Sequence, residues 1–400
     1  MKEITRRSAA VRWWNPGNAG WWLLVVFVAT GGWVLVTNLG PAFERFAVTG
    51  ALAVLFSVPM LALVWWLVKS MQIVTRPARS ASVAAVVWGA VVATGVFALN
   101  ANSAVILLLA QHVSLDFANE WGAAIAAPLT EETGKLLGVV AVVVAARSWL
   151  RGPMDGLLIG ALVGLGFLLT ENVIYAFNIT AMSFGESQPI ATLVTYLLRT
   201  GLFWPVSHAI FTAFTGAALG FLFGRPAARR YGQGLLCLAL AYGVHFLWNA
   251  PVLPGILWRM AFAACIPFLL WLVIHLARRA EHSWVTSVLD GEVAAGTLPR
   301  EWVDGLAATL RARVRRRRQL ARTYGAAVRP VQRAHEALLV DLADAVDAGD
   351  EEGAKALRAV ASQALEEGRR RAEEAARAQA DYQRQLDEYR RYWAERGYQV

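Results

Sequence analysis

Ionisable side chains lie inside four consecutive apolar segments of this 400-residue chain, at depths where a membrane helix normally has none. The first segment contains Glu131, Glu132 and Lys135, and the second contains Glu171 followed by Asn172. A charged side chain at the centre of a bilayer costs roughly 2.5–3.5 kcal/mol on insertion scales. Groups this costly persist where they pair with each other or carry out a reaction, so all of them are candidate functional residues.

Each of the next two segments contributes a histidine. His208 lies in the third segment, and His245 lies in the fourth with Asn249 four residues later on the same helical face. Asn249 could therefore orient the His245 imidazole. The same spacing joins Glu131 to Lys135 in the favoured Glu-to-Lys order, so Lys135 could neutralise one carboxylate and leave the other for chemistry.

Carboxylates and imidazoles gathered at one site support two kinds of hydrolytic chemistry. In the first, they bind zinc and one glutamate remains free as the general base. In the second, no metal is needed, because a glutamate takes a proton from water and the histidines stabilise the oxyanion. The sequence contains no His-Glu-x-x-His helix and no Gly-x-Ser-x-Gly nucleophile motif. Both glutamate-based mechanisms stay open at this stage.

The composition indicates what kind of scaffold must position these residues. Hydrophobic residues make up 57% of the chain, which is too apolar for a soluble domain of this size. They fall in blocks of about 20 residues, the length that crosses a bilayer as a helix. The sequence therefore predicts an all-α, polytopic transmembrane helix bundle. We expect about eight spans, near residues 19–36, 46–68, 82–99, 121–146, 156–177, 201–223, 235–252 and 256–277.

The distribution of basic residues predicts how the bundle is oriented. Lysines and arginines gather in every second loop and after the last span, which is typical of the cytoplasmic side. We therefore expect a multi-pass cell-membrane protein with both termini in the cytoplasm, residues 1–18 being the N-terminal part. The same rule accounts for the net charge of +9, so no nucleic-acid partner is expected.

Counting residues from the predicted outer ends places the four site-bearing segments in register. Glu131, Glu171, His208 and His245 all fall in the outer half of the bilayer or near its midplane, so they can converge on one cavity. Arg199 is expected at the outer interface, where it can snorkel to the headgroups. The apolar run at 104–109 is too short to span and is expected to be an interfacial or re-entrant piece.

Small residues at a spacing of four predict how closely two of these helices approach. Gly160 and Gly164 lie in the fifth predicted span, and Gly216 and Gly220 lie in the sixth. Such residues let helix backbones pack closely in membranes. We expect them to bring the site-bearing helices together.

The chain changes character after the last span. Residues 278–400 are rich in Ala, Arg and Glu and predict a cytoplasmic helical tail. Its run at 311–318 is strongly basic, and attraction to anionic lipid of the inner leaflet is the partner it indicates. A turn is expected at 349–353, where two glycines flank acidic residues.

Four short motifs in a fixed order resemble a known family. They are Glu-Glu-x-x-Lys at 131–135, Phe-x-x-x-Glu-Asn at 167–172, His208, and His-x-x-x-Asn at 245–249. Together they resemble the PrsW family of polytopic intramembrane proteases, which is related to the CAAX prenyl proteases and the Abi-like membrane proteases. The resemblance covers residues 120–250 within an expected protease domain of residues 19–277. The first motif favours PrsW over CAAX-type relatives, which carry Glu-Glu-x-x-x-Arg.

The resemblance implies an endopeptidase that hydrolyses membrane-anchored protein substrates, as in regulated intramembrane proteolysis. It implies a catalytic set with three supporting residues: Glu131, Glu132, Glu171, His208 and His245, supported by Lys135, Asn172 and Asn249. Within this set, Glu171, His208 and His245 are the expected metal ligands for zinc, and a metal-free glutamate mechanism stays open.

Two other functions are compatible with buried acids and histidines. A proton-coupled transporter also uses them, but it predicts inverted repeats, and none is evident in the sequence. A non-catalytic membrane scaffold predicts that site substitutions affect stability alone.

Overall fold

The computed structural model describes residues 14–71, 77–146, 150–202, 207–253, 255–306, 310–324 and 328–394. These residues form helices and no strand, which confirms the predicted all-α class. Contacts divide the chain into two compact units, one of residues 7–281 and one built mainly from residues 282–400. The helix α11, Gly255–Ala294, begins in the first unit and ends in the second.

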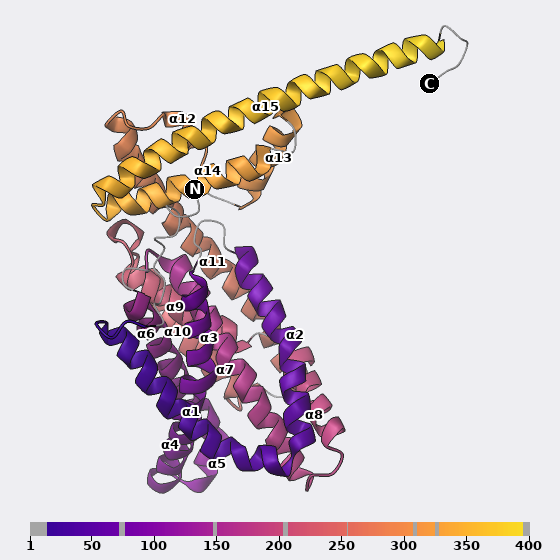
Figure 1. Ribbon diagram of the computed structural model, residues 1–400. Coiled ribbons are helices and arrows are strands. Elements are labelled where there is room, and N and C mark those ends of the chain that lie inside the picture. Colours follow the sequence, from indigo (N-terminus) through magenta and orange to yellow (C-terminus); the bar gives the residue numbers. More distant parts are fainter. Residues whose placement is uncertain are drawn as a thin grey trace. The chain divides into compact units, whose positions relative to one another are not determined.

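The first unit is a bundle of helices (Figure 1). Several of them are continued by wider π-helical turns, which we call η2, η3 and η4. Its elements before α11 are α1 Ala19–Arg45, α2 Ala47–Met71, α3 Arg79–Val87, η2 Trp88–Ala98, α4 Leu99–His112, α5 Leu115–Ala127, η3 Pro128–Glu132, α6 Thr133–Ala146, α7 Pro153–Met182, α8 Gln188–Tyr196, η4 Leu197–Leu202, α9 Ser207–Phe223, the 3-10 turn η5 Pro226–Ala228 and α10 Tyr231–Asn249.

Five of the described helical stretches are long and apolar enough to cross a membrane. They are Ala19–Arg45, Ala47–Met71, Arg79–His112, Pro153–Met182 and Leu257–Ala294. The apolar helix Ser207–Phe223 is shorter. The predicted span at 121–146 corresponds to α5, η3 and α6, and it contains the three charged residues of the first motif. Part of the predicted span at 201–223, residues 203–206, lies outside the described residues.

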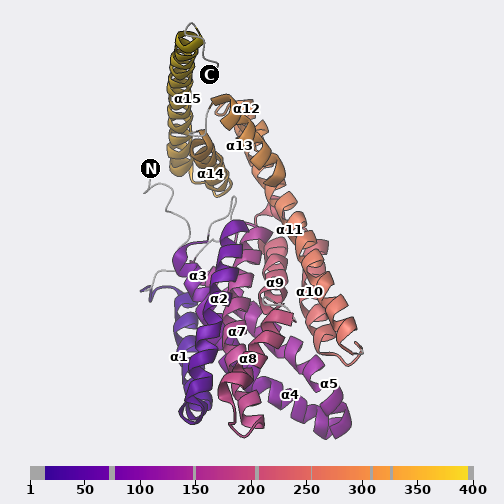
Figure 2. The same ribbon diagram turned by 90° about the vertical axis from the view of Figure 1, so that its right-hand side faces the viewer.

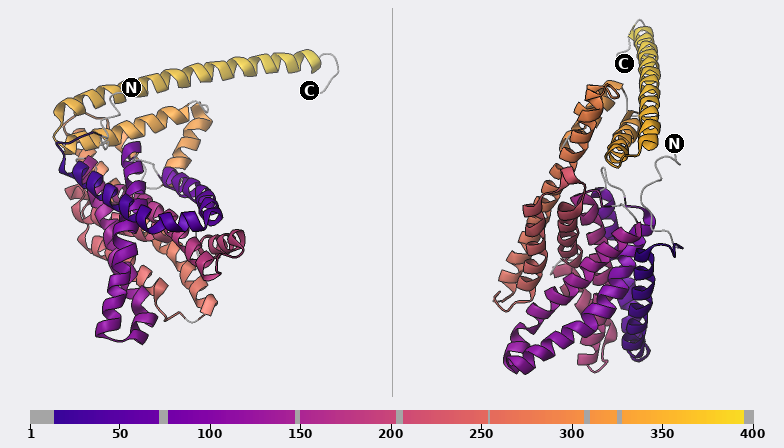
Figure 3. Two further views of the ribbon diagram at one scale, coloured as in Figure 1. Left: turned by 60° about the horizontal axis from the view of Figure 1, so that its bottom comes forward. Right: turned by 90° about the vertical axis from the view of Figure 1, so that its left-hand side faces the viewer.

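The apolar run at 104–109 is part of a long helix and not a separate interfacial or re-entrant piece. Arg79–His112 is helical throughout, because no glycine or proline interrupts its last two turns. The chain then reverses at Ser114, whose side chain caps α5 by accepting a hydrogen bond from the Phe117 N–H (3.1 Å). Figures 2 and 3 show α4 and α5 lying side by side as a hairpin. This hairpin brings Asn102 of α4 next to η3.

The helix α7 is the centre of the bundle. It packs against α2, α3, η2, α6, α8 and α9, and Figure 2 shows it among α2, α3, α8 and α9. Every residue of its first four turns, from Pro153 to Leu168, is buried. An apolar helix buried all round fits the middle of a large bundle, and α7 carries Glu171 in its second half.

The glycines at a spacing of four form the contact between α7 and α9, as predicted. A Cβ on Gly160 would lie 2.1 Å from the carbonyl oxygen of Thr212, and one on Gly216 would lie 2.0 Å from the carbonyl oxygen of Gly156. A Cβ on Gly164 would lie 2.1 Å from the carbonyl oxygen of His208. The backbones of the two helices therefore touch, and Gly164 sets the distance between α7 and His208.

Replacing Gly164 by alanine is expected to destabilise the bundle by about 1–3 kcal/mol, because α9 must move away to admit the new methyl group. The midpoint of unfolding in detergent measures this. Gly243→Ala in α10 is the matched control, since a Cβ there meets nothing within 4 Å. A Gly164→Ala protein that unfolds at the wild-type midpoint would contradict this account of the α7–α9 contact.

The second unit contains α12 Arg300–Asp304, α13 Leu310–Tyr324, α14 Val328–Asp347 and α15 Glu351–Ala394. The turn predicted at 349–353 is present, with Gly349 at a positive φ of 70° and Asp350 capping α15 through the Gly353 N–H (2.9 Å). Residues on facing sides of α14 and α15 form the core of this hairpin, among them Leu338, Leu342 and Leu357. Figure 1 shows α15 running back along α14 and continuing well past its start.

Ion pairs hold the second unit together around this hairpin. Arg358 donates from Nε to Glu292 (2.6 Å) and from Nη2 to the other oxygen of the same carboxylate (2.9 Å). Arg317 of the basic run pairs with Glu336. Burial lowers the pKa of His335, whose ring packs edge-on against Trp302. The basic run therefore belongs to a folded helix, α13, with part of its charge compensated.

Candidate active site

Acidic and histidine side chains from four elements meet inside the first unit. Glu131 and Glu132 come from η3, Glu171 from α7, His208 from the first turn of α9 and His245 from α10. With two cations, they form what we call the Glu/His cluster: Glu131, Glu132, Lys135, Glu171, Arg199, His208 and His245. The structure thus brings the five residues expected to be catalytic into one place, as the matched depths of their segments predict.

A local widening of the helix presents both glutamates of the first motif. Pro128 has no N–H to donate, and the helix forms a π turn over Pro128–Glu132 before α6 begins. Single π turns of this kind occur frequently at functional sites. Both carboxylates point into the bundle from this turn, and Glu131 and Glu132 are 4% and 0% exposed.

Glu131 is held from one side and faces the imidazoles with the other. Its Oε1 accepts a hydrogen bond from Asn102 Nδ2 (2.9 Å), and the Thr130 hydroxyl donates to the Asn102 side chain. Its Oε2 lies 3.3 Å from Lys135 Nζ, 3.9 Å from His245 Nε2 and 4.0 Å from His208 Nδ1. Asn102 therefore fixes the carboxylate in the orientation that points Oε2 at both histidines.

Lys135 is a buried cation between the two glutamates. Its Nζ donates to Glu132 Oε1 (2.9 Å) and to Glu131 Oε2 (3.3 Å), and it lies 3.7 Å from the centre of the Phe167 ring. The sequence predicts the pairing with Glu131, but the closer partner is Glu132. The second oxygen of Glu132, Oε2, is buried without a hydrogen-bond partner among the described residues, which is uncommon in a native protein.

Each histidine is oriented by a carboxylate on the side away from Glu131. His245 Nδ1 donates to Glu132 Oε1 (2.9 Å), and His208 Nε2 donates to Glu171 Oε2 (2.9 Å). An ionised carboxylate only accepts hydrogen bonds, so these contacts place the imidazole protons on His245 Nδ1 and His208 Nε2. The nitrogens that face Glu131 are then unprotonated. Lys135 Nζ, which can only donate, lies 3.0 Å from His208 Nδ1 and agrees with this tautomer.

Arg199 pairs with the cluster and does not extend to the headgroups as expected. Its Nη2 donates to Glu171 Oε2 (2.5 Å) and its Nε donates to Asn172 Oδ1 (2.9 Å). Asn172 thus acts as a partner of Arg199. Arg199 lies in η4, which continues α8. The turn between α7 and α8 reverses the chain, so η4 faces α7.

Asn249 occupies a different position from the one predicted. Its side chain donates weakly to the carbonyl of Ala123 (3.5 Å), while the His245 nitrogen expected to be its partner is bonded to Glu132. Asn249 does line the cavity beside His245.

Residues 203–206, which precede Ser207 and His208, lie outside the described residues.

A cavity of about 370 Å³ opens onto the cluster. Its wall includes Glu131, Glu171, Arg199, His208 and His245, but neither Glu132 nor Lys135. Apolar and small side chains make up much of the rest, namely Ile106, Ala123, Ala126, Ala127, Leu168 and Trp248. The cavity therefore gives water and an apolar chain segment access to two of the three carboxylates.

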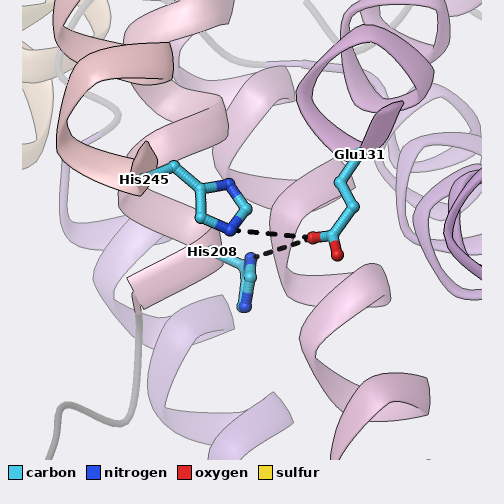
Figure 4. A group of neighbouring side chains, drawn as sticks. All are labelled: Glu131, His208 and His245. Carbon is cyan, nitrogen blue, oxygen red and sulfur yellow. Dashed lines mark ion pairs between the residues drawn. The ribbon is translucent and has the colours of Figure 1, made fainter. Parts of the chain in front are cut away.

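One oxygen and two nitrogens of the cluster are arranged to hold a metal ion. Suitable ligand atoms of Glu131, His208 and His245 all lie within 4.8 Å of one another (Figure 4). Two imidazoles and a carboxylate are a donor set of catalytic zinc, and each imidazole carries the outer carboxylate partner that zinc-binding histidines usually have. Lys135 approaches His208 Nδ1 on the same side, so binding requires its ammonium to withdraw toward Glu132. With that movement, the residues fit a metal.

Comparisons with known proteins agree with this geometry. The family model described as "PrsW family intramembrane metalloprotease" matches residues 77–277, which include every residue of the Glu/His cluster. No curated protein and no solved structure matches the chain.

Proposed function

Since the chain belongs to the PrsW family of intramembrane metalloproteases, we propose that Glu131, His208 and His245 carry its hydrolysis of peptide bonds. The observation that carries this assignment is the convergence of these three side chains on one point at the wall of a cavity. A buried Glu/His cluster in a membrane protease is a catalytic site, whereas a transporter or a scaffold is not favoured by the family match. Membrane proteins are the substrates that this activity implies.

The two histidines present unprotonated nitrogens to the centre of the cluster, which is the form that ligates a metal. Glu131 Oε2 is the third donor. When bound there, a metal would lower the pKa of its water and polarise the scissile carbonyl. Without a metal, Glu131 would itself take the proton from water. It lines the cavity, and its Oε2 accepts no hydrogen bond from His208 or His245, which lie 4.0 and 3.9 Å away.

The other two glutamates support the histidines. Glu132 is completely buried, does not line the cavity and orients His245 through Nδ1. Glu171 orients His208 through Nε2. This assignment differs from the ligand set expected from the sequence, in which Glu171 and not Glu131 accompanies the two histidines. Glu171 Oε2 already accepts hydrogen bonds from both His208 and Arg199, which is why we prefer Glu131.

Metal content separates the two ligand sets. We expect about one zinc per chain in the purified protein and a nearly complete loss in His208→Ala, His245→Ala and Glu131→Ala. Glu171→Ala should still bind zinc, with an affinity lower by about 10–100-fold, because its effect is transmitted through His208. Glu120→Ala, an exposed position on α5, is the matched control. Zinc retained in Glu131→Ala and lost in Glu171→Ala would instead support the set predicted from the sequence.

We further infer a bundle of eight spans with both termini in the cytoplasm. The five stretches that are long enough to cross support this count, together with α9, α10 and the continuous helix through α5, η3 and α6. The positions of the basic loops support the orientation. On this topology α13 lies on the cytoplasmic side, where its arginines would be attracted to anionic lipid.

A further inference from the structure

Arg199 is a charged residue of the cavity that belongs to none of the four motifs. Its guanidinium reaches from η4 to α7, where Nε donates to Asn172 Oδ1 (2.9 Å) and Nη2 donates to Glu171 Oε2 (2.5 Å). The same guanidinium lies 3.6 Å from the centre of the Tyr175 ring, a cation–π contact. Three contacts with three residues of one helix fix the planar group in a single orientation.

The oxygen that Arg199 holds is the one that orients His208. Glu171 Oε2 accepts hydrogen bonds from both Arg199 Nη2 and His208 Nε2. Arg199 supplies the compensating charge of this carboxylate in a largely apolar surrounding, and it fixes the position of the oxygen to which the imidazole donates.

Through this contact Arg199 holds the carboxylate that orients the His208 ring. In this orientation Nδ1 lies toward the centre of the cluster, 4.0 Å from Glu131 Oε2 and 3.0 Å from Lys135 Nζ. An imidazole released by Glu171 could rotate and carry Nδ1 away from this position. The contacts with Glu171, Asn172 and Tyr175 also exclude the plainer explanation, an arginine extended toward lipid headgroups.

We propose that Arg199 is a positioning residue, which holds Glu171 and thereby fixes the orientation of the His208 ring. It acts without contacting the Glu131 carboxylate. The proposal rests on the proposed function for its effect on catalysis, but its effect on His208 is a property of the protein without substrate.

The first test measures His208 directly. In protein with ¹⁵N-labelled histidine, the wild type should show one sharp Nε2–H signal of His208, held by its hydrogen bond to Glu171, with His208→Ala providing the assignment. Arg199→Ala should shift and broaden that signal, because Glu171 is no longer held in place, and Arg199→Lys, which keeps the charge, should retain most of it. Arg45→Ala, an exposed arginine at the end of α1, is the matched control. An unchanged His208 signal in Arg199→Ala would overturn the proposal, whatever the activity of the protein.

The second test uses cleavage. Arg199→Ala should lower kcat by about 10–100-fold with little change in KM, which is the size of effect typical of residues that orient metal-bound histidines. Guanidinium ion at low millimolar concentration should restore part of the activity of Arg199→Ala and none of that of Glu171→Gln. A loss confined to KM would overturn the proposal, because Arg199 would then bind substrate. Absence of cleavage by the wild type would count against the proposed function and leave the His208 Nε2–H signal to decide on Arg199.

Discussion

Glu131→Gln is expected to lower the kcat for peptide-bond cleavage by about 10²–10⁴-fold, the range found when a group that transfers a proton in the transition state is removed. The amide has the shape of the carboxylate and can still accept the hydrogen bond from Asn102. It cannot take a proton from water, and it is a much weaker metal ligand. Both forms of the mechanism therefore predict a large loss.

The fold should survive this substitution, which makes the loss interpretable. Lys135 keeps its closer partner, Glu132, at 2.9 Å, and so remains compensated. The measurement is the rate of cleavage of a single-span substrate at saturation, with Glu120→Gln on the same helix hairpin as control. A wild-type kcat in Glu131→Gln would show that Glu131 is not catalytic, and Glu171 would then be the candidate for its role.

The largest effect on stability is expected for Lys135→Met, which should cost about 3–5 kcal/mol, the usual result of breaking a buried ion pair from one side. The Lys135 side chain is 0% exposed and lies between Glu131 and Glu132, with His208 Nδ1 at 3.0 Å. Methionine fills a similar volume but leaves two adjacent carboxylates in the bundle without their shared cation. A buried uncompensated charge is far more costly than an exposed one.

A second substitution shows whether the charge, and not the shape, is responsible. Lys135→Met combined with Glu132→Gln removes one charge of each sign, so most of the lost stability should return. Lys69→Met at the end of α2 is the control, because that ammonium is exposed. The free energy of unfolding in mixed detergent is the quantity to compare. Wild-type stability in Lys135→Met would mean that the carboxylates are compensated in some other way.

Local spacing in the sequence is enough to predict part of this site. The pairing of Glu131 with Lys135 follows from their separation by one helical turn, and the close contact of α7 with α9 follows from Gly160, Gly164 and Gly216. The order of the four motifs is enough to predict the PrsW family. The link from there to the CAAX and Abi-like proteases stays a prediction.

Contacts between distant parts of the chain could not be predicted in this way. His245 is hydrogen-bonded to Glu132, which lies 113 positions earlier in the chain. Spacing along one helix favoured Asn249 as its partner instead, because Asn249 is one turn away from His245. Asn102 belongs to α4, in which the sequence signals only an apolar run too short to span, yet it fixes Glu131. The predicted span at 82–99 ended before Asn102, so nothing in the sequence indicated this contact.

Arg199 illustrates the same limit in another way. An arginine near the end of a membrane segment most often extends to the interface, and the sequence offered no reason to prefer a partner. Its pairing with Glu171 depends on the turn between α7 and α8, which returns the chain so that η4 faces α7. Membrane burial of charges therefore depends on tertiary contacts that hydropathy alone does not report.

The most direct test of the central claim is to identify the peptide bond that the purified protein cleaves. Wild type and Glu131→Gln would be incubated in detergent with a panel of single-span membrane proteins, and the new termini would be determined by mass spectrometry. The account predicts new termini within or beside the hydrophobic span of a substrate with the wild type, and none with Glu131→Gln. The same termini formed at the same rate by both proteins would contradict the claim that hydrolysis takes place at the Glu131, His208 and His245 site.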